Sequence, residues 1–334
     1  MKNFLMQVHL ESSINKGEDN YLIYKDDPES KVIAVFDGLG GRSAGFDHQT
    51  GGQIASKLAS TATKRILQQS HFPLTPSLSE QIQTAICQLL REQADIKMSH
   101  SRLKGTLAGK RLCTTLALAA IPKTLEDDYS VQIAWIGDSR IYFLSPQKGL
   151  QQLSKDDLEV DKDALEMIRE DPPMSQYLTA DFPQEWSIHF AAYNFEEKGC
   201  LFVCTDGCFQ YLSTPWDFEK LLLQTLLDSK DWEDWGNHLK EFYENIKQDD
   251  ISLVLSPLGI ETFEEGKELY QPRLNNLLNT YGDNQEANLK QLQALWEKYR
   301  QNYEARLIDF TSSSSTEEQL ETDESRVQEV TNNA

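Results

Sequence analysis

The sequence predicts an α+β protein in which a sheet-rich core is flanked by helices. Two continuous apolar runs are typical of buried strands, and each closes with Asp-Gly: KVIAVFDG (31–38) and CLFVCTDG (200–207). In the segments between candidate strands, apolar residues recur three or four positions apart, which indicates amphipathic helices. Periodicity alone does not fix the order of the strands.

Four further segments complete the set of candidate strands: YLIY (21–24), CTTLALAAI (113–121), VQIAWIGDSRIYFL (131–144) and ISLVLSP (251–257). The third of these carries Gly137 and Asp138 in its middle. We therefore expect two strands joined at that point, followed by a turn at SPQKG (145–149).

The helical spacing extends over four clear segments and a C-terminal region: 52–69, 79–98, a helix opening at Thr214–Pro215, 231–247, and one or two helices within 261–308. The last helices either dock on the core or offer a surface to a partner. From Thr311 onward large apolar residues are almost absent, which favours disorder. We predict a core domain over 1–257, a helical extension over 258–310 and a disordered acidic tail over 311–334.

The composition is that of an ordinary globular protein, with 39% hydrophobic and 25% charged residues among 334. No apolar run approaches the roughly 20 residues that span a bilayer. The first residues, MKNFLMQVHLESS, are too few and too polar for a secretory signal. Five cysteines, an odd number scattered through apolar stretches, fit reduced thiols. A cytoplasmic location is expected.

The formal net charge is −21, from 53 acidic and 32 basic residues. A field of that sign repels nucleic acid and anionic membranes, so neither is expected as a partner. The same field attracts divalent cations wherever carboxylates converge.

Several acids stand at the ends of candidate strands: Glu18, Asp19, Asp37, Asp206 and Asp249. A carboxylate at the end of a buried strand loses much of its water, so its ionisation is costly unless a cation or hydrogen bonds compensate. Mg²⁺ and Mn²⁺ favour such oxygen ligands, and two ions about 3.5–4 Å apart can clamp a phosphoryl oxygen. Any single Asp-Gly after a strand is equally compatible with a simple turn, so the ordered set carries the prediction.

The chain resembles the PPM family, the protein phosphatase 2C-like serine/threonine phosphatases, of bacterial type. The matching motifs occur in the family's order: GEDNYLI (17–23), VFDGLGG (35–41), CTTLALAAI (113–121), IAWIGDSRIYFL (133–144), LSKDD (153–157), FVCTDG (202–207) and DDISLVL (249–255). The resemblance covers roughly residues 5–257. It implies a four-layer α-β-β-α sandwich of two antiparallel sheets, to which this chain adds a C-terminal helical extension.

The resemblance also implies a catalytic site with two or three Mg²⁺ or Mn²⁺ ions. Asp37 matches the acid that bridges two metals, and the carbonyl of Gly38 matches a further ligand. Asp206 and Asp249 match the remaining direct carboxylate ligands. In this family a hydroxide between the metals attacks phosphorus in line, without a covalent enzyme intermediate.

Three more acids have implied roles. Glu18 and Asp19 match the pair that holds metal-bound waters. Asp138, in WIGDSR, matches an acid that helps bind a third, weaker metal in bacterial members. The alternative for Asp138 is a local hydrogen bond within a hairpin.

Two segments depart from the family pattern or extend it. Many members carry an arginine before the acidic pair that grips the substrate phosphate, whereas here the only cation is Lys16. Lysine lacks the bidentate fork, and Arg42 is the alternative source of a guanidinium. The segment 171–183 stands where bacterial members carry a mobile flap over the active site.

The expected function is metal-dependent hydrolysis of phosphoserine and phosphothreonine in proteins, opposing a serine/threonine kinase. Two alternatives stay open at this point: a phosphoprotein-binding adaptor of the same fold with little turnover, and a hydrolase of a small phosphate ester. Metal-dependent hydrolysis separates the enzyme from the adaptor.

Overall fold

Two five-stranded sheets form the centre of the molecule, and every strand pairing in them is antiparallel. The first sheet has the order β1 (Met6–Leu10), β13 (Ile251–Leu258), β12 (Gly199–Cys204), β8 (Arg140–Ser145) and β9 (Gly149–Gln152). The second has the order β11 (His189–Phe195), β7 (Tyr129–Ile136), β6 (Leu116–Ile121), β3 (Lys31–Phe36) and β2 (Asn20–Lys25). A third, small sheet joins β10 (Leu178–Thr179), β5 (Cys113–Thr114) and β4 (Gly38–Leu39).

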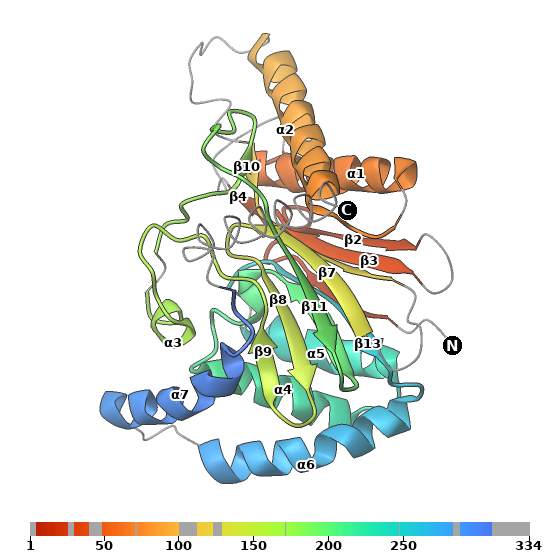
Figure 1. Cartoon of the computed structure of the whole chain (residues 1–334). Helices are drawn as coiled ribbons and strands as arrows, with labels where there is room; N and C mark the ends of the chain where they lie inside the picture. Colours follow the sequence, from red (N-terminus) through yellow and green to blue (C-terminus); the bar gives the residue numbers. More distant parts are fainter. Residues whose placement is uncertain are drawn as a thin grey trace, which may run out of the picture.

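These strands and the helices below come from a computed structural model, which describes residues 5–25, 30–39, 49–70, 72–99, 112–122, 129–170, 172–246, 248–282 and 288–308. Helices α1 (Gly51–Gln69) and α2 (Pro76–Ser99) lie beyond the second sheet (Figure 1). On the side of the first sheet lie α4 (Pro215–Asp228), α5 (Trp232–Ile246), α6 (Phe263–Tyr281) and α7 (Leu289–Tyr303). A one-turn helix, α3 (Ala164–Met167), precedes β10. The predicted four-layer α-β-β-α sandwich is confirmed.

The inner strands are buried on both faces, as β3 illustrates. Ile33 and Val35 pack into the cluster between the two sheets, while Val32, Ala34 and Phe36 pack toward α1 and α2. Side chains alternate along a strand, so both faces of β3 must be apolar. This double burial explains why KVIAVF reads as a continuous apolar run rather than as an alternating one.

The two strands predicted in 131–144 do not form a hairpin, because β7 belongs to the second sheet and β8 to the first. The chain crosses between the sheets at Gly137, whose φ of 98° lies in the region that favours glycine. Asp138 follows at this crossing. Asp138 therefore does not lie in a hairpin. Burial raises its pKa, although a hydrogen bond from its own backbone lowers it, as the local alternative expects. The turn expected at 145–149 does close a hairpin, in which Ser145 pairs with Gly149.

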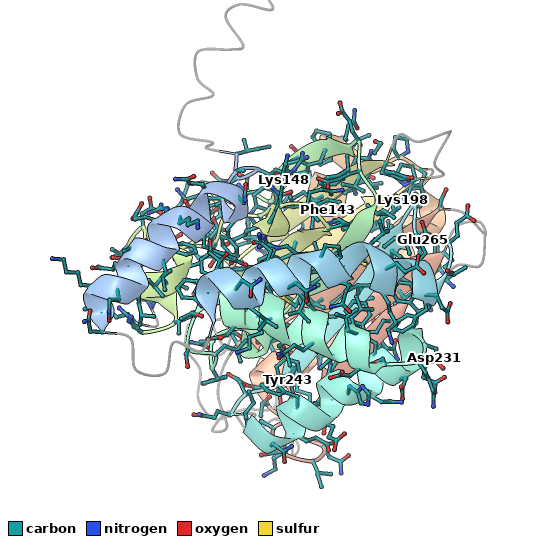
Figure 2. The ribbon with its side chains drawn as sticks, turned by 90° about the horizontal axis from the view of Figure 1, so that it is seen from below. Phe143, Lys148, Lys198, Asp231, Tyr243 and Glu265 are labelled. Carbon is teal, nitrogen blue, oxygen red and sulfur yellow. The ribbon has the colours of Figure 1, made fainter. Side chains whose placement is uncertain are left out.

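The C-terminal helices dock on the core. Glu219 of α4 is fully buried and accepts hydrogen bonds from Arg273 of α6 at 2.6 Å and from the Tyr299 hydroxyl of α7, also at 2.6 Å. Figure 2 shows this helical face, where Lys198 and Glu265 form an ion pair at 2.7 Å. The domain boundary at 257 stays a prediction, and the predicted tail lies outside the described residues. None of the described helices combines the length and apolar character that a membrane crossing requires.

Candidate functional site

Asp37 lies at the centre of a group of acids that come from separate strand ends. It follows β3, Asp19 precedes β2, Asp206 follows β12, and Asp138 lies at the crossing from β7 to β8. Burial raises the pKa of Asp37 well above its usual value, and the charges of Asp19, Asp206, Asp138 and Asp249 raise it further, in that order. Five predicted site residues are thus brought within electrostatic reach of one another.

Asp19 and Asp138 show the same effect. Burial is the main cause that raises the pKa of Asp19 well above its usual value, although a hydrogen bond from Thr205 opposes it. Burial also raises the pKa of Asp138, with the charge of Asp206 as the next cause. Without a cation, each carboxylate in this group makes ionisation of the others more costly.

A hydroxyl holds Asp37 in place. The backbone N–H of Asp37 donates to Thr115 Oγ1 at 3.0 Å, and the N–H of Thr115 donates to the Asp37 carbonyl at 2.8 Å. Thr115 Oγ1 also lies 2.7 Å from the hydroxyl of Ser139, the neighbour of Asp138. The strand predicted over 113–121 is interrupted at Thr115 between β5 and β6, and this exchange of bonds with Asp37 takes the place of a ladder pairing there.

Asp250 holds the loop that carries Glu18 and Asp19. It is buried, and its carboxylate accepts the backbone N–H groups of Ser12 at 2.6 Å and of Glu18 at 2.5 Å. Asp249 beside it is exposed. The two adjacent acids therefore have different roles. Asp250 fixes a loop, whereas Asp249 is exposed and its charge raises the pKa of Asp37.

The Gly38 backbone passes directly against the start of α1. A Cβ atom added at Gly38 would overlap the carbonyl group of Gly52, and one added at Gly52 would overlap the carbonyl group of Gly38. Glycine at both positions is thus a steric requirement. Similarly, a Cβ at Gly207 would overlap the carbonyl oxygen of Asp250, so the turn after Asp206 also needs glycine.

The donor set suits a hard divalent cation. All of the converging side chains are carboxylates, and Oδ1 of Asp138 is buried without a hydrogen-bond partner among the described residues. Nevertheless, no group of three or more His, Cys, Asp or Glu side chains within the described ranges already has the arrangement of a metal site. The residues present fit Mg²⁺ or Mn²⁺ by chemistry and charge, while the coordination geometry is not preformed.

A sequence comparison decides the family, since the model for protein phosphatase 2C matches residues 9–244. The chain belongs to the protein phosphatase 2C family. This family is generally metal-dependent, which agrees with the carboxylate cluster. The match includes the predicted acids from Glu18 to Asp206 and ends before Asp249. No curated protein is similar enough in sequence to count as a match.

Solved structures of bacterial phosphatases share the fold. The serine/threonine phosphatase Stp1 from Staphylococcus aureus is 17% identical, with a TM-score of 0.60 over 78% of this chain and 96% of that one. The Mycobacterium tuberculosis phosphatase PstP/Ppp is 19% identical, with a TM-score of 0.52 over 76% and 98%. PppA, described as a key regulatory component of T6SS in Pseudomonas aeruginosa, is 20% identical, with a TM-score of 0.52 over 77% and 99%.

The loop predicted as a flap is tied through Asp157 to Gly137, the residue directly before Asp138. Within 171–183, the structure describes residues 172–183, and Gln176 donates to Asp157 Oδ1 at 3.1 Å. His189 lies 2.7 Å from the same oxygen, and Asp157 Oδ2 accepts the N–H of Gly137 at 2.9 Å. Strand β10 in this loop also connects through β5 to β4, directly after Asp37. Mobility of this loop stays a prediction.

Of the two cations predicted to bind the substrate phosphate in this phosphatase 2C fold, the structure describes only Lys16. Lys16 is exposed on the loop before Glu18. Arg42 lies outside the described residues, so its position stays untested.

Sequence reasoning missed three side chains that support the acid cluster: Thr115, Thr205 and Asp250. The signal for Asp250 was present in the Asp-Asp pair of DDISLVL, where only the first acid was assigned. Thr205 directly precedes Asp206 in CTDG, and Thr115 lies in the middle of a predicted strand. Their partners are distant in sequence, so spacing alone did not identify them.

Proposed function

We propose that this chain hydrolyses phosphoserine and phosphothreonine in proteins, with divalent cations held by its carboxylate cluster. The observation that carries the proposal is the environment of Asp37. Burial raises the pKa of this carboxyl group, and the charges of four nearby acids raise it further. A cluster of this kind is stable in its ionised form only with a compensating cation.

Each acid has a distinct part in the proposal. Asp37, Asp206 and Asp249 would hold two Mg²⁺ or Mn²⁺ ions directly, with the carbonyl of Gly38 as a further ligand. Glu18 and Asp19 would orient water molecules by accepting their hydrogen bonds.

Asp138 would contribute to a third, weaker site, consistent with its buried Oδ1. Bound divalent cations supply Lewis acidity that lowers the pKa of water and neutralises phosphoryl charge.

The residues around the cluster do the positioning. Thr115 fixes the Asp37 backbone, Thr205 donates to Asp19, and Asp250 fixes the loop before β2. Lys16 and Arg42 are the proposed cations for the phosphate. Lys16 is exposed, so it can reach a phosphate on a large substrate such as a folded protein. A cytoplasmic location, an opposing serine/threonine kinase, and the absence of nucleic acid and membrane as partners belong to the same proposal.

The test is phosphate release from phosphothreonine and phosphotyrosine peptides of one sequence, with Mn²⁺, with Mg²⁺ and with a chelator. Release from the phosphothreonine peptide should require a metal and exceed release from the phosphotyrosine peptide. Asp37→Asn and Asp206→Asn should each lower the rate about a hundredfold or more. Asp228→Asn, at the exposed end of α4, is the matched control and should leave the rate unchanged.

Two outcomes would replace the proposal. A folded protein that binds the phosphothreonine peptide without releasing phosphate is an adaptor. A protein that cleaves p-nitrophenyl phosphate but neither peptide acts on small esters instead.

A further inference from the structure

Helix α7, the last helix that the structure describes, contacts a residue of the WIGDSR segment. The hydroxyl of Tyr303, on α7, lies 2.8 Å from the hydroxyl of Tyr142. It also accepts a hydrogen bond from Arg140 at 3.3 Å, and Arg140 donates to Tyr142 at 3.1 Å. All three side chains are buried. Arg140 stands two residues after Asp138, so α7 is connected to the neighbourhood of the acid cluster through this arginine.

Arg140 in turn is fixed against two residues that border the acid cluster. Its guanidinium donates three hydrogen bonds to Asp156, the shortest at 2.7 Å. It also lies over the ring of Phe209, 4.1 Å from the centroid. Asp156 and Phe209 line the same small pocket as Asp138 and Asp206. Moving Arg140 would therefore move a wall of the pocket in which Asp138 lies.

A second connection runs from α7 to another part of the lining of that pocket. The indole N–H of Trp296 donates to Asp163 Oδ2 at 2.8 Å, and Arg300 forms an ion pair with the same oxygen at 3.4 Å. Asp163 is the N-cap of α3 and accepts the N–H groups of Leu165 and Glu166. Met167 and Ile168, at the end of this short helix, line the pocket with Asp138.

Helix α7 lies outside the part of the chain that the family match covers, because that match ends at residue 244. The bacterial structures are matched over 96% to 99% of their own length, but these matches cover only 76% to 78% of this chain. The two connections from α7 thus start from a part of the chain beyond the family match.

We propose that α7 is a positioning element for the active site, in which the Tyr303 hydroxyl holds Arg140 and thereby the pocket around Asp138. The inference rests on the proposed function, since it assigns the affected pocket to metal binding. Packing of α7 on the core does not depend on this hydroxyl alone, because the ring of Tyr299 contacts the rings of Trp216 and Tyr281, and the ring of Tyr303 contacts that of Tyr142. Removal of the hydroxyl alone therefore separates positioning from docking.

The experiment compares Tyr303→Phe with Tyr299→Phe in the full chain. Each change removes one buried tyrosine hydroxyl from α7, but Tyr299 donates to Glu219, which contacts no residue of the acid cluster in the described structure. The readouts are calorimetric titration with Mn²⁺ and thermal unfolding of the metal-free protein. Tyr303→Phe should weaken the weakest Mn²⁺-binding step about three- to tenfold, somewhat less than loss of a direct partner of a metal ligand. Tyr299→Phe should leave Mn²⁺ binding as in the wild type.

A double-mutant cycle with Asp138→Asn completes the test. If Tyr303 acts through the Asp138 pocket, Tyr303→Phe should have no further effect on Mn²⁺ binding once Asp138 is neutral. Equal Mn²⁺ binding by the Tyr303→Phe, Tyr299→Phe and wild-type proteins would overturn the inference while leaving the phosphatase proposal intact. Conversely, a Tyr303→Phe effect on Mn²⁺ binding in a chain that releases no phosphate would support the inference and reject the proposed function.

Discussion

The hydroxyl of Thr205 donates a hydrogen bond to the carboxylate of Asp19 at 2.7 Å, across 186 residues of sequence. This bond links the turn that carries Asp206 to the loop that carries Glu18. It also favours the ionised form of Asp19 and so opposes the effect of burial on the pKa of that carboxyl group. Thr205 is fully buried, so water does not replace the bond if it is lost.

Replacement of Thr205 by valine should therefore weaken metal binding and catalysis. Valine keeps the shape of threonine but removes the donor, so Asp19 becomes harder to ionise. We expect phosphate release at limiting Mn²⁺ to fall about tenfold, with partial recovery at saturating Mn²⁺. Thr205→Ser retains the hydroxyl and should stay close to the wild type. Loss of activity in Thr205→Ser but not in Thr205→Val would show that the methyl group, rather than the hydrogen bond, matters.

Substitution of Asp250 should mainly lower stability, whereas substitution of Asp249 should mainly lower activity. Asp250→Ala leaves the N–H groups of Ser12 and Glu18 without their acceptor, which should lower the free energy of unfolding by about 2–3 kcal/mol. Asp249→Ala removes an exposed side chain, so it should change stability little while abolishing metal-dependent activity. Chemical denaturation and phosphate release on the same two samples check both statements. A stable, active Asp249→Ala variant would remove Asp249 from the site.

The metal-free protein should become less stable as the pH rises from acid toward neutral. The pKa of Asp37 is raised in the folded state, so the unfolded chain loses this proton first, near the ordinary value of 3.8. Above that pH the folded state bears an ionisation cost, which amounts to about 1.4 kcal/mol for each pKa unit of the shift. Asp37→Asn removes one of the charges and should raise the melting temperature at pH 7 but not at pH 4.

Metal should cancel this pH effect in the wild type. Mn²⁺ compensates the charges of the acids, so the rise in melting temperature on adding Mn²⁺ should be larger at pH 7 than at pH 5. Asp37→Asn should show little response to Mn²⁺ at either pH. A wild-type protein whose metal-free stability is unchanged between pH 4 and pH 7 would contradict the electrostatic interpretation of the cluster.

Glycine at position 38 should be indispensable. The Cβ atom in Gly38→Ala would overlap the backbone of Gly52, so the start of α1 must shift and Asp37 must move with it. We expect a loss of stability of about 1–3 kcal/mol and a loss of activity. Gly266→Ala in α6 is the matched control, because its Cβ would meet its nearest neighbour at 3.6 Å. That change should stabilise the protein by about 0.5–1 kcal/mol, since alanine favours a helix over glycine.

The sequence supports prediction of the fold because each strand carries its own signal. The apolar runs at 31–36 and 200–204 are buried on both faces, and Thr214–Pro215 begins a helix with the threonine side chain as its cap. The resemblance to the phosphatase family then implies that two sheets pack between layers of helices, an arrangement that periodicity alone does not reveal.

What escaped prediction depends on contacts between distant segments. The break of the strand at Thr115 comes from its bonds to Asp37, and the passage from one sheet to the other at Gly137 follows from sheet pairing. The sequence likewise left open whether the C-terminal helices dock, since the connections from Tyr303 to Arg140 and from Trp296 to Asp163 cross more than a hundred residues. An amphipathic pattern shows that a helix has a partner face but does not identify the partner.

The most direct test of the central claim is anomalous scattering from crystals grown with Mn²⁺. We predict two strong anomalous peaks that share Asp37 as a ligand, with Asp206 and Asp249 completing the carboxylates, and a weaker peak beside Asp138. Peaks that lie away from Asp37, or their absence at a Mn²⁺ concentration that saturates calorimetric binding, would contradict the assignment of this carboxylate cluster as the metal site.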